Sequence, residues 1–218
     1  DTIPRQVAES LGLPRFEPGM ILEGGAIEIN GRGLLLTTEA VLLNPNRNPE
    51  LSREQIEQCL QEYLGAEEVV WLERGIEGDD TGGHVDDLAR FASDEVVLAC
   101  VDRKRDSPNR EVLTSNLLRL REAIGDRCEI VELPMPQACE VPGWRLPVLP
   151  ASYANFLIIN GAVLVPTFRQ SAGDDRAMGT LRELFPGRDI IGIDCLDIVE
   201  EGGALHCLSQ QQPAATKG

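Results

Sequence analysis

The sequence contains few histidines, few aromatic residues and little positive charge. Only two of its 218 residues are histidine, and aromatic residues make up 4%. Lysine and arginine together number 20 against 36 aspartates and glutamates, which gives a formal net charge of −16. Nucleic-acid binding requires a basic surface, so this balance argues against a nucleic-acid partner. It is compatible with a cationic small-molecule substrate, and equally with acidity that only maintains solubility.

Long apolar stretches are also missing. No segment reaches the ~20 consecutive apolar residues that a membrane-spanning helix needs, and no signal peptide opens the sequence. We therefore expect no membrane partner and a cytoplasmic location. The first residue is Asp1 rather than methionine, which indicates that the start of the chain was processed, trimmed or lost.

The cysteines lack the spacing of a metal site. All six are widely separated, and no C-x-x-C pair occurs; they lie at positions 59, 100, 128, 139, 195 and 207. We predict no bound metal and reduced thiols, most of which fill the core as small apolar side chains. With 42% hydrophobic and 26% charged residues, the chain has the composition of one globular domain with a sizeable core.

A unit of about 65 residues recurs three times. Two Asn-Gly pairs, which favour tight hairpin turns, and one Ser-Asp-Glu turn each separate two short apolar segments. Asn30 precedes Asp94 by 64 residues, and Asp94 precedes Asn160 by 66. The predicted strand pairs are 26–29 with 34–38, 88–91 with 96–101, and 156–159 with 162–165.

Each hairpin is followed by a helical pattern and another short strand. Ser52 and Gln55 form a capping-box signature at the start of the first helix. Apolar stripes then end at Gly65, Gly125 and Pro186, and strands are predicted at 69–72, 129–133 and 189–193. The fold class is therefore α+β, built of ββαβ repeats, and residues 201–207 resemble the start of another unit. An unrelated series of α+β elements is the alternative.

Polar residues in glycine-flanked segments form a candidate site. Glu23, His84, Asn155 and Cys207 occupy comparable positions, at or just before the first strand of successive units. Equivalent strand ends arranged around an axis meet, so these four side chains should converge. Asp86, two residues after His84 on a predicted strand, should face the same side.

Each candidate also has a structural interpretation. A cysteine in a chain of six is more often a core residue, and a lone histidine near a turn is usually a satisfied polar group. Glu23 alone would be a solvated loop carboxylate, and Asn155 a cap at a strand end. His206 is expected to be structural or supporting, although it precedes Cys207.

Five segments together resemble the agmatine deiminase family. They are Leu22–Ile27, Asn44–Pro49, Gly82–Phe91, Ala151–Phe156 and His206–Pro213. That family belongs to the guanidine-modifying pentein superfamily. The resemblance therefore implies the pentein fold, a five-bladed propeller of ββαβ blades. The chain is then a single pentein-type catalytic domain over residues 1–218. It is an incomplete propeller with about three and a half of the five blades.

The resemblance implies hydrolysis of agmatine to N-carbamoylputrescine and ammonia without a metal or organic cofactor. Cys207 would be the nucleophile that forms an amidino-thioether, and His84 the general acid and base. Glu23 would hold His84 and the substrate, and Asp86 would pair with the guanidinium nitrogens. The further substrate-binding positions implied are Asp80, Asn155 and Gly203. A thiolate attacker and carboxylate partners suit a planar cation whose carbon is a poor electrophile.

The sequence departs from the family in its length. The family's W-x-R-D-x-G-P-like stretch, whose aspartate grips the guanidinium, has no match here, and Gly82 stands where the family more often has Asn. Five units of ~65 residues would need roughly 330 residues. The resemblance thus predicts that the N-terminal blades are missing and the ring is open. An open ring favours either homo-oligomer formation or pairing with the missing segment.

Two alternatives stay open at this point. One is deimination of arginine or peptidyl-arginine, which would need an arginine, with Arg169 the one to consider, to hold the α-carboxylate. The other is a truncated, non-catalytic pentein that serves as a binding or assembly module. The expected partner in the main hypothesis is a small cationic guanidine such as agmatine.

Overall fold

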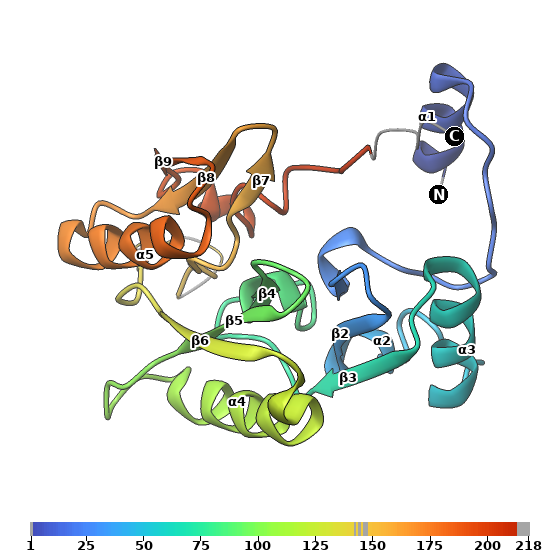
Figure 1. Ribbon diagram of the computed structural model, residues 1–218, viewed down its shortest axis with the longest axis horizontal. Helices are drawn as coiled ribbons and strands as arrows, with labels where there is room; N and C mark the ends of the chain where they lie inside the picture. The colour runs from blue at the N-terminus through green and yellow to red at the C-terminus, as the bar shows by residue number, and fades with distance from the viewer. Residues whose placement is uncertain (1, 142, 144, 146–147, 213–218) are drawn as a thin grey trace.

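The computed structural model describes residues 2–141, 143, 145 and 148–212, and the chain within them forms three similar units (Figure 1). The first contains β1 (Glu28–Ile29), β2 (Leu34–Thr38), α3 (Arg53–Leu64) and β3 (Glu68–Leu72). The second contains β4 (Ala89–Phe91), β5 (Val96–Val101), α4 (Arg110–Ile124) and β6 (Glu129–Pro134). The third contains β7 (Leu157–Ile159), β8 (Ala162–Thr167), α5 (Ser171–Leu184) and β9 (Asp189–Asp194).

Shorter elements connect these units. They are the helices α1 (Ile3–Leu11) and α2 (Glu39–Leu42) and the 3-10 turns η1 (Gly24–Ala26), η2 (Val85–Asp87), η3 (Gly125–Arg127) and η4 (Val199–Glu201). Neither α1 nor α2 was predicted from the sequence. No helix in the described ranges is long and apolar enough to cross a membrane.

The three sheets share one topology. In each, the first two strands form an antiparallel hairpin and the third runs parallel to the second, with the second strand in the centre. In the first sheet Glu28 lies opposite Leu36, and Leu34 opposite Glu68. The parallel pairing requires a crossover, which a helix supplies in every unit. The predicted ββαβ unit is therefore confirmed three times.

Local sequence signals set the helix ends. The Ser52 hydroxyl accepts from the Gln55 backbone N–H at 3.3 Å, and the Gln55 side chain accepts from the Ser52 N–H at 2.8 Å. This reciprocal pair is the predicted capping box, which satisfies two N–H groups that the first turn of a helix leaves free. Gly65 ends α3 in the left-handed region at φ 69°, where glycine is the least strained residue.

Strand β2 shows how each sheet is covered on both faces. Leu35 packs into a cluster with Ile56 and Leu60 of α3, whereas Leu34 and Leu36 belong to the larger core that runs through all three units. Successive side chains of a strand point to opposite faces, so one strand serves both clusters. Four of the six cysteines are buried, all six are free thiols, and Cys59 and Cys207 are more accessible. The prediction that most of the cysteines lie in the core is thus confirmed.

The strand predicted around His84 and Asp86 is wrong. Gly82 and Gly83 both have positive φ, 89° and 111°, and reverse the chain just before His84. Residues 85–87 then form η2, and strand pairing begins only at Ala89. Residues 201–212 likewise contain no strand: the 3-10 turn η4 ends at Glu201 and the rest of this segment is irregular. Pro213 lies outside the described residues.

Candidate active site

Three loops from different units enclose a cavity of about 370 Å³. The first loop surrounds η1, the second leads into η2, and the third follows η4. The cavity is lined by Glu23, Gly24, Gly25, Asp80, Thr81, His84, Glu201, Gly202, Gly203, His206, Cys207, Leu208, Ser209 and Gln210. Side chains from both ends of the sequence therefore meet at one place, as the repeat predicted for Glu23, His84 and Cys207.

His84 presents an unsatisfied imidazole nitrogen at this cavity. The residue is 8% exposed, and its Nε2 atom has no hydrogen-bond partner. The nearest charge is Glu23 Oε1, 3.7 Å from Nε2, which is beyond hydrogen-bond length. The His84 backbone N–H donates to Asp79 Oδ2 at 3.1 Å, so the loop fixes the residue. Buried polar atoms are normally paired, and an orphan of this kind indicates a site that binds something.

Gly25 brings η1 against the tip of this loop. A Cβ atom built there would lie 2.6 Å from His84 Nδ1 and 2.7 Å from Asp86 Oδ2. His84 and Asp86 therefore face the same neighbour, as predicted, although a 3-10 turn and not a strand brings this about. Only glycine leaves room for both side chains at this point.

Glu23 is held by an arginine that the sequence analysis did not single out. Arg47 Nε donates to Oε2 of Glu23 at 2.8 Å, and Arg47 Nη2 donates to Oε1 at 2.6 Å. Burial acts to raise the pKa of Glu23, but the hydrogen bonds and charge of Arg47, together with His84, outweigh it and lower that pKa overall. In the sequence analysis, segment 44–49 was named only as part of the family resemblance. The arginine within that segment was the one signal that could have pointed to this contact.

Asn155 surrounds Cys207 with hydrogen bonds. Its Nδ2 atom lies 3.0 Å from Cys207 Sγ and 3.1 Å from Asp87 Oδ1. Its Oδ1 atom accepts the backbone N–H groups of His206 and Cys207 at 2.9 Å and 3.2 Å. Every polar atom of the buried Asn155 amide is thus engaged in shaping the loop that carries the sulfur.

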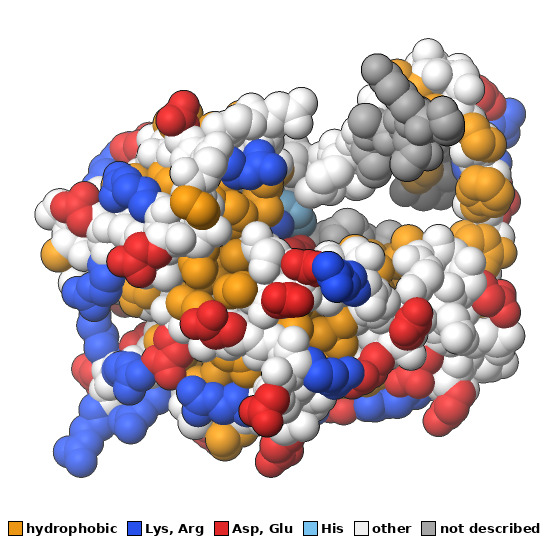
Figure 2. Space-filling model, viewed as in Figure 1, with side chains coloured by type: hydrophobic (Ala, Val, Ile, Leu, Met, Phe, Trp, Pro, Cys, Tyr) orange, Lys and Arg blue, Asp and Glu red, His pale blue; other side chains and the backbone are white. Residues whose placement is uncertain are grey.

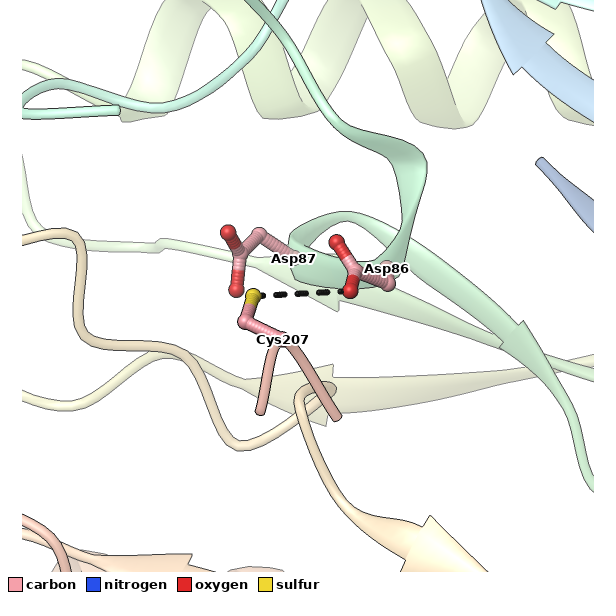
Figure 3. A group of neighbouring side chains, drawn as sticks. All are labelled: Asp86, Asp87 and Cys207. Carbon is pink, nitrogen blue, oxygen red and sulfur yellow. Dashed lines mark hydrogen bonds between the residues drawn. The ribbon is translucent and has the colours of Figure 1, made fainter. Parts of the chain in front are cut away.

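Two buried carboxyl groups lie beside this sulfur. Asp86 Oδ2 is 3.6 Å from Cys207 Sγ and 2.7 Å from His206 Nδ1. Its other oxygen, Oδ1, is buried without a partner. Figure 3 shows the Cys207 sulfur between the carboxyl groups of Asp86 and Asp87. Asp87 entered the sequence analysis only as part of a motif, and nothing in its local pattern distinguished it from a solvated acid.

These carboxyl groups determine the electrostatics of the site. Burial, followed by the negative charges of Asp87 and Asp86, raises the pKa of the Cys207 thiol well above its ordinary value. The hydrogen bond from Asn155 opposes this shift without cancelling it. Burial and the neighbouring Asp86 also raise the pKa of Asp87. Burial beside two acidic groups therefore favours the neutral thiol, and it favours a cation that offsets the charge of the acidic pair.

The remaining predicted positions lie around the rim. Asp80 pairs with Arg145, whose Nη1 is 2.5 Å from Oδ2. The backbone of Gly203 packs closely against Cys207, because a Cβ built at Gly203 would lie 2.5 Å from Cys207 Cβ. Arg169, considered for an α-carboxylate, bonds to Asp194 and Asp197 instead and does not line the cavity.

The same atoms could serve two kinds of cation. One ligand atom each from Asp86, Asp87 and Cys207 lie within 4.8 Å of one another, a set that suits a divalent metal such as zinc. The unpartnered Oδ1 atom of Asp86 also suits a hydrogen-bond donor of the planar guanidinium group. The geometry thus identifies a compact cation site next to a cysteine and a histidine.

Comparison with known proteins decides the family. The sequence profile of the Porphyromonas-type peptidyl-arginine deiminase family matches residues 1–213. The chain belongs to this family. Among its curated relatives, the agmatine deiminase of Medicago truncatula is 39% identical over 235 residues, which covers 97% of this chain and 62% of that protein.

Solved structures of relatives share the fold. The agmatine deiminase of Enterococcus faecalis superposes with a TM-score of 0.88 at 32% identity, covering 96% of this chain and 62% of that one. A dimethylarginine dimethylaminohydrolase, at 19% identity and a TM-score of 0.53, shares the fold alone. The predicted pentein-type α+β fold is thus confirmed at this level. The chain spans less than two thirds of the length of these family members.

Proposed function

We propose that this deiminase-family chain carries the catalytic centre of an agmatine deiminase, which hydrolyses agmatine to N-carbamoylputrescine and ammonia. The observation that carries the proposal is that Cys207 and the unpaired Nε2 atom of His84 line one cavity, with the buried Asp86 in contact with the Cys207 sulfur. Relatives named as agmatine deiminases support the choice of substrate. The proposed catalytic residues are Cys207, His84, Glu23 and Asp86.

The proposed binding step uses the carboxylates. The free Oδ1 atom of Asp86 would accept N–H groups of the guanidinium, and Glu23 would accept from its other side. At the rim, Asp80 and Glu201 face the cavity, and we assign them to the cationic tail of agmatine. Gly203 and Asn155 would contribute by leaving space and by fixing the Cys207 loop.

Substrate binding would generate the nucleophile. Before substrate binds, a neutral thiol is favoured because burial and two carboxyl groups oppose the thiolate. A guanidinium cation bound beside the sulfur and Asp86 would offset those charges, so the pKa of Cys207 would fall when the substrate enters. The thiolate, the species able to attack a guanidinium carbon, would thus form only where its target is present.

The chemical steps then balance as two displacements. The Cys207 thiol proton would pass to His84 as a C–S bond forms between the sulfur and the guanidinium carbon. One C–N bond would then break as His84 gives this proton to the departing ammonia. His84 next takes a proton from water, whose oxygen bonds to the same carbon while the C–S bond breaks. The cysteine is regenerated and N-carbamoylputrescine leaves. General acid–base assistance by one histidine is worth roughly 10²–10⁴ in rate.

The cavity lining favours agmatine over arginine. Among the described residues that line it, none is lysine or arginine, so no free cation there faces an α-carboxylate. Arginine would bring a carboxylate toward Glu201, and like charges repel. The ammonium tail of agmatine would meet the opposite sign at Glu201.

The finer architecture belongs to the same proposal. We assign the three ββαβ units to successive blades of a five-bladed propeller, with η4 and the following segment opening the next blade. Residues 1–218 then form a single catalytic domain. The identical strand order of the three sheets supports this arrangement.

The test is ammonia release from agmatine and from arginine, measured side by side with the 218-residue chain. We expect turnover of agmatine, loss of turnover in Cys207→Ala, and near-normal turnover in Cys59→Ala, a partly exposed cysteine away from the cavity. Mass spectrometry of a slowed variant, His84→Ala, should show Cys207 heavier by agmatine less ammonia. Equal activity in Cys207→Ala and the wild type would refute the assignment.

A further inference from the structure

Arg47 lies behind Glu23, outside the lining of the cavity, and connects the two loops that carry Glu23 and His84. Its guanidinium holds the Glu23 carboxylate through Nε and Nη2, and Nη2 also donates to the Thr81 carbonyl. The Arg47 side chain is 15% exposed. Residues 81 and 84 belong to one short loop, so a single side chain fixes both walls of this end of the cavity.

The surrounding segment is built to hold this arginine in place. Asn48 pairs with the backbone of Ile21 through both amide atoms: its Oδ1 accepts from the Ile21 N–H at 2.8 Å, and its Nδ2 donates to the Ile21 carbonyl at 3.0 Å. The backbone N–H of Arg47 donates to Asn44 O at 3.0 Å. The turn over residues 44–49 is therefore hydrogen-bonded to the segment that immediately precedes Glu23.

We infer that Arg47 is a positioning residue, which fastens the Glu23 carboxylate beside His84 and locks the His84 loop to η1. The inference rests on the proposed function and deepens it, since it gives the segment 44–49 a role in the same site. Arg47 acts through Glu23 and does not touch the reacting atoms. Its planar fork matches both carboxylate oxygens at once, which a lysine ammonium does not do.

A change in Glu23 geometry is expected to be costly. Glu23 Oε1 already stands 3.7 Å from His84 Nε2, so a modest rotation would take the carboxylate away from the imidazole. Displacement of a catalytic group by about 1 Å can lower the rate about 10²-fold. Without Arg47, burial would also act on Glu23 unopposed by its strongest partner, and the pKa of Glu23 would rise.

The experiment compares Arg47→Met, Arg47→Lys and the control Arg53→Met. Arg53 forms a similar pair with Glu39, 2.5 Å from Nη2 to Oε1, but lies away from the cavity. We expect kcat for agmatine to fall about 10²-fold in Arg47→Met, less in Arg47→Lys, and to be unchanged in Arg53→Met. The acid limb of the pH profile should move upward in Arg47→Met, because Glu23 must be ionised.

A second measurement works without turnover. In ¹³C NMR titrations, the carboxyl carbon of Glu23, assigned with Glu23→Gln, should titrate below 4.5 in the wild type and higher in Arg47→Met. Inactive wild-type protein would refute the agmatine proposal, and the titration would still decide the role of Arg47. An unchanged Glu23 titration overturns the inference. If Arg47→Met does not fold, wild-type kcat and KM in Arg47→Lys overturn it equally.

Discussion

At the residue scale, burial and two acidic neighbours raise the pKa of the Cys207 thiol. Asp86 Oδ2 lies 3.6 Å from the sulfur, and the Asp87 side chain is buried close by. Two carboxyl groups this close to a thiol disfavour a second or third negative charge. We therefore expect reactivity to depend on a cation binding beside the sulfur, and of the two carboxyl groups Asp87 has the larger charge effect on the pKa of the thiol.

Replacing Asp87 with Asn should free the thiol and stabilise the fold at neutral pH. The pKa of Asp87 is raised above 3.8, so the stability it contributes is present below that value and is lost as the pH rises through its folded pKa. An asparagine at position 87 does not ionise, so this loss of stability does not occur. Its side-chain oxygen can still accept the hydrogen bond from Asn155 Nδ2. Urea unfolding at pH 5 and pH 8 should show the variant gaining on the wild type as pH rises.

Iodoacetamide provides the second readout for the same change. One fewer negative charge near Cys207 lowers the pKa of its thiol, so alkylation of Cys207 at pH 8 should be faster in Asp87→Asn. Asp126→Asn, on the exposed turn η3, is the matched control and should leave the alkylation rate unchanged. Equal rates in all three proteins would show that Asp87 does not govern the thiol.

At the scale of elements, two glycines occupy very different settings. One is required by the space around it, and the other only lowers the helix propensity of its segment. Gly25, in η1, lies where any Cβ would collide with His84 and Asp86. Gly179, inside α5, has nothing within 4 Å of a built Cβ. A helix-interior glycine without such a constraint only adds conformational entropy to the unfolded chain.

Replacing glycine with alanine should therefore be favourable at position 179 and harmful at position 25. Gly179→Ala is expected to raise the free energy of unfolding by about 1 kcal/mol and leave agmatine turnover unchanged. Gly25→Ala should lower turnover about 10²-fold by displacing His84 and Asp86. Both are measured by urea unfolding and ammonia release. Normal turnover in Gly25→Ala would mean that η1 moves freely and does not define the site.

At the scale of the whole molecule, buried polar links hold the units together. Arg90, 3% exposed, donates to Glu28 of the first unit at 2.8 Å and to the carbonyl groups of Ala154 and Phe156 in the third. A buried arginine needs all these partners, since each unsatisfied charge-bearing group is costly. The hydrogen bonds of Arg90 therefore help to fix how the three units pack together. That packing determines where the loops of the site converge.

Helix α1 stands outside this framework. None of its residues is buried, and it lies apart from the three sheets in Figure 1. Figure 2 shows apolar side chains along this part of the molecule; Ile3, Val7, Leu11 and Phe16 are all exposed. An isolated helix of this length is marginal in water because most helical stability comes from packing.

Hydrogen exchange should expose this difference. The amides of α1 are expected to exchange at close to unfolded-chain rates, whereas those of α4, which buries five residues, should be strongly protected. Mass spectrometry of peptides from both helices after a short exposure to heavy water measures this. Protection in α1 equal to that in α4 would show that its apolar face is covered in solution.

The sequence determined the repeating unit because its signals are local. The Asn-Gly turns, the Ser52 capping box and Gly65 act within a few residues, and the structure places the strands and helices of the three units close to where these signals predicted them. The identities of Cys207, His84, Asp86 and Glu23 as site candidates also came from the sequence, through a family resemblance that the comparisons support. Their catalytic roles stay predictions.

Only the tertiary structure decided how these residues are held. The fork between Arg47 and Glu23 spans 24 residues, and the bond from Asn155 to Cys207 spans 52. No local pattern encodes such contacts, because they depend on how the units pack around Arg90. The burial of Asp87, and with it the neutral state of the thiol, follows from the same packing. The sequence supplied the chemical groups, and the assembled fold set their distances and charges.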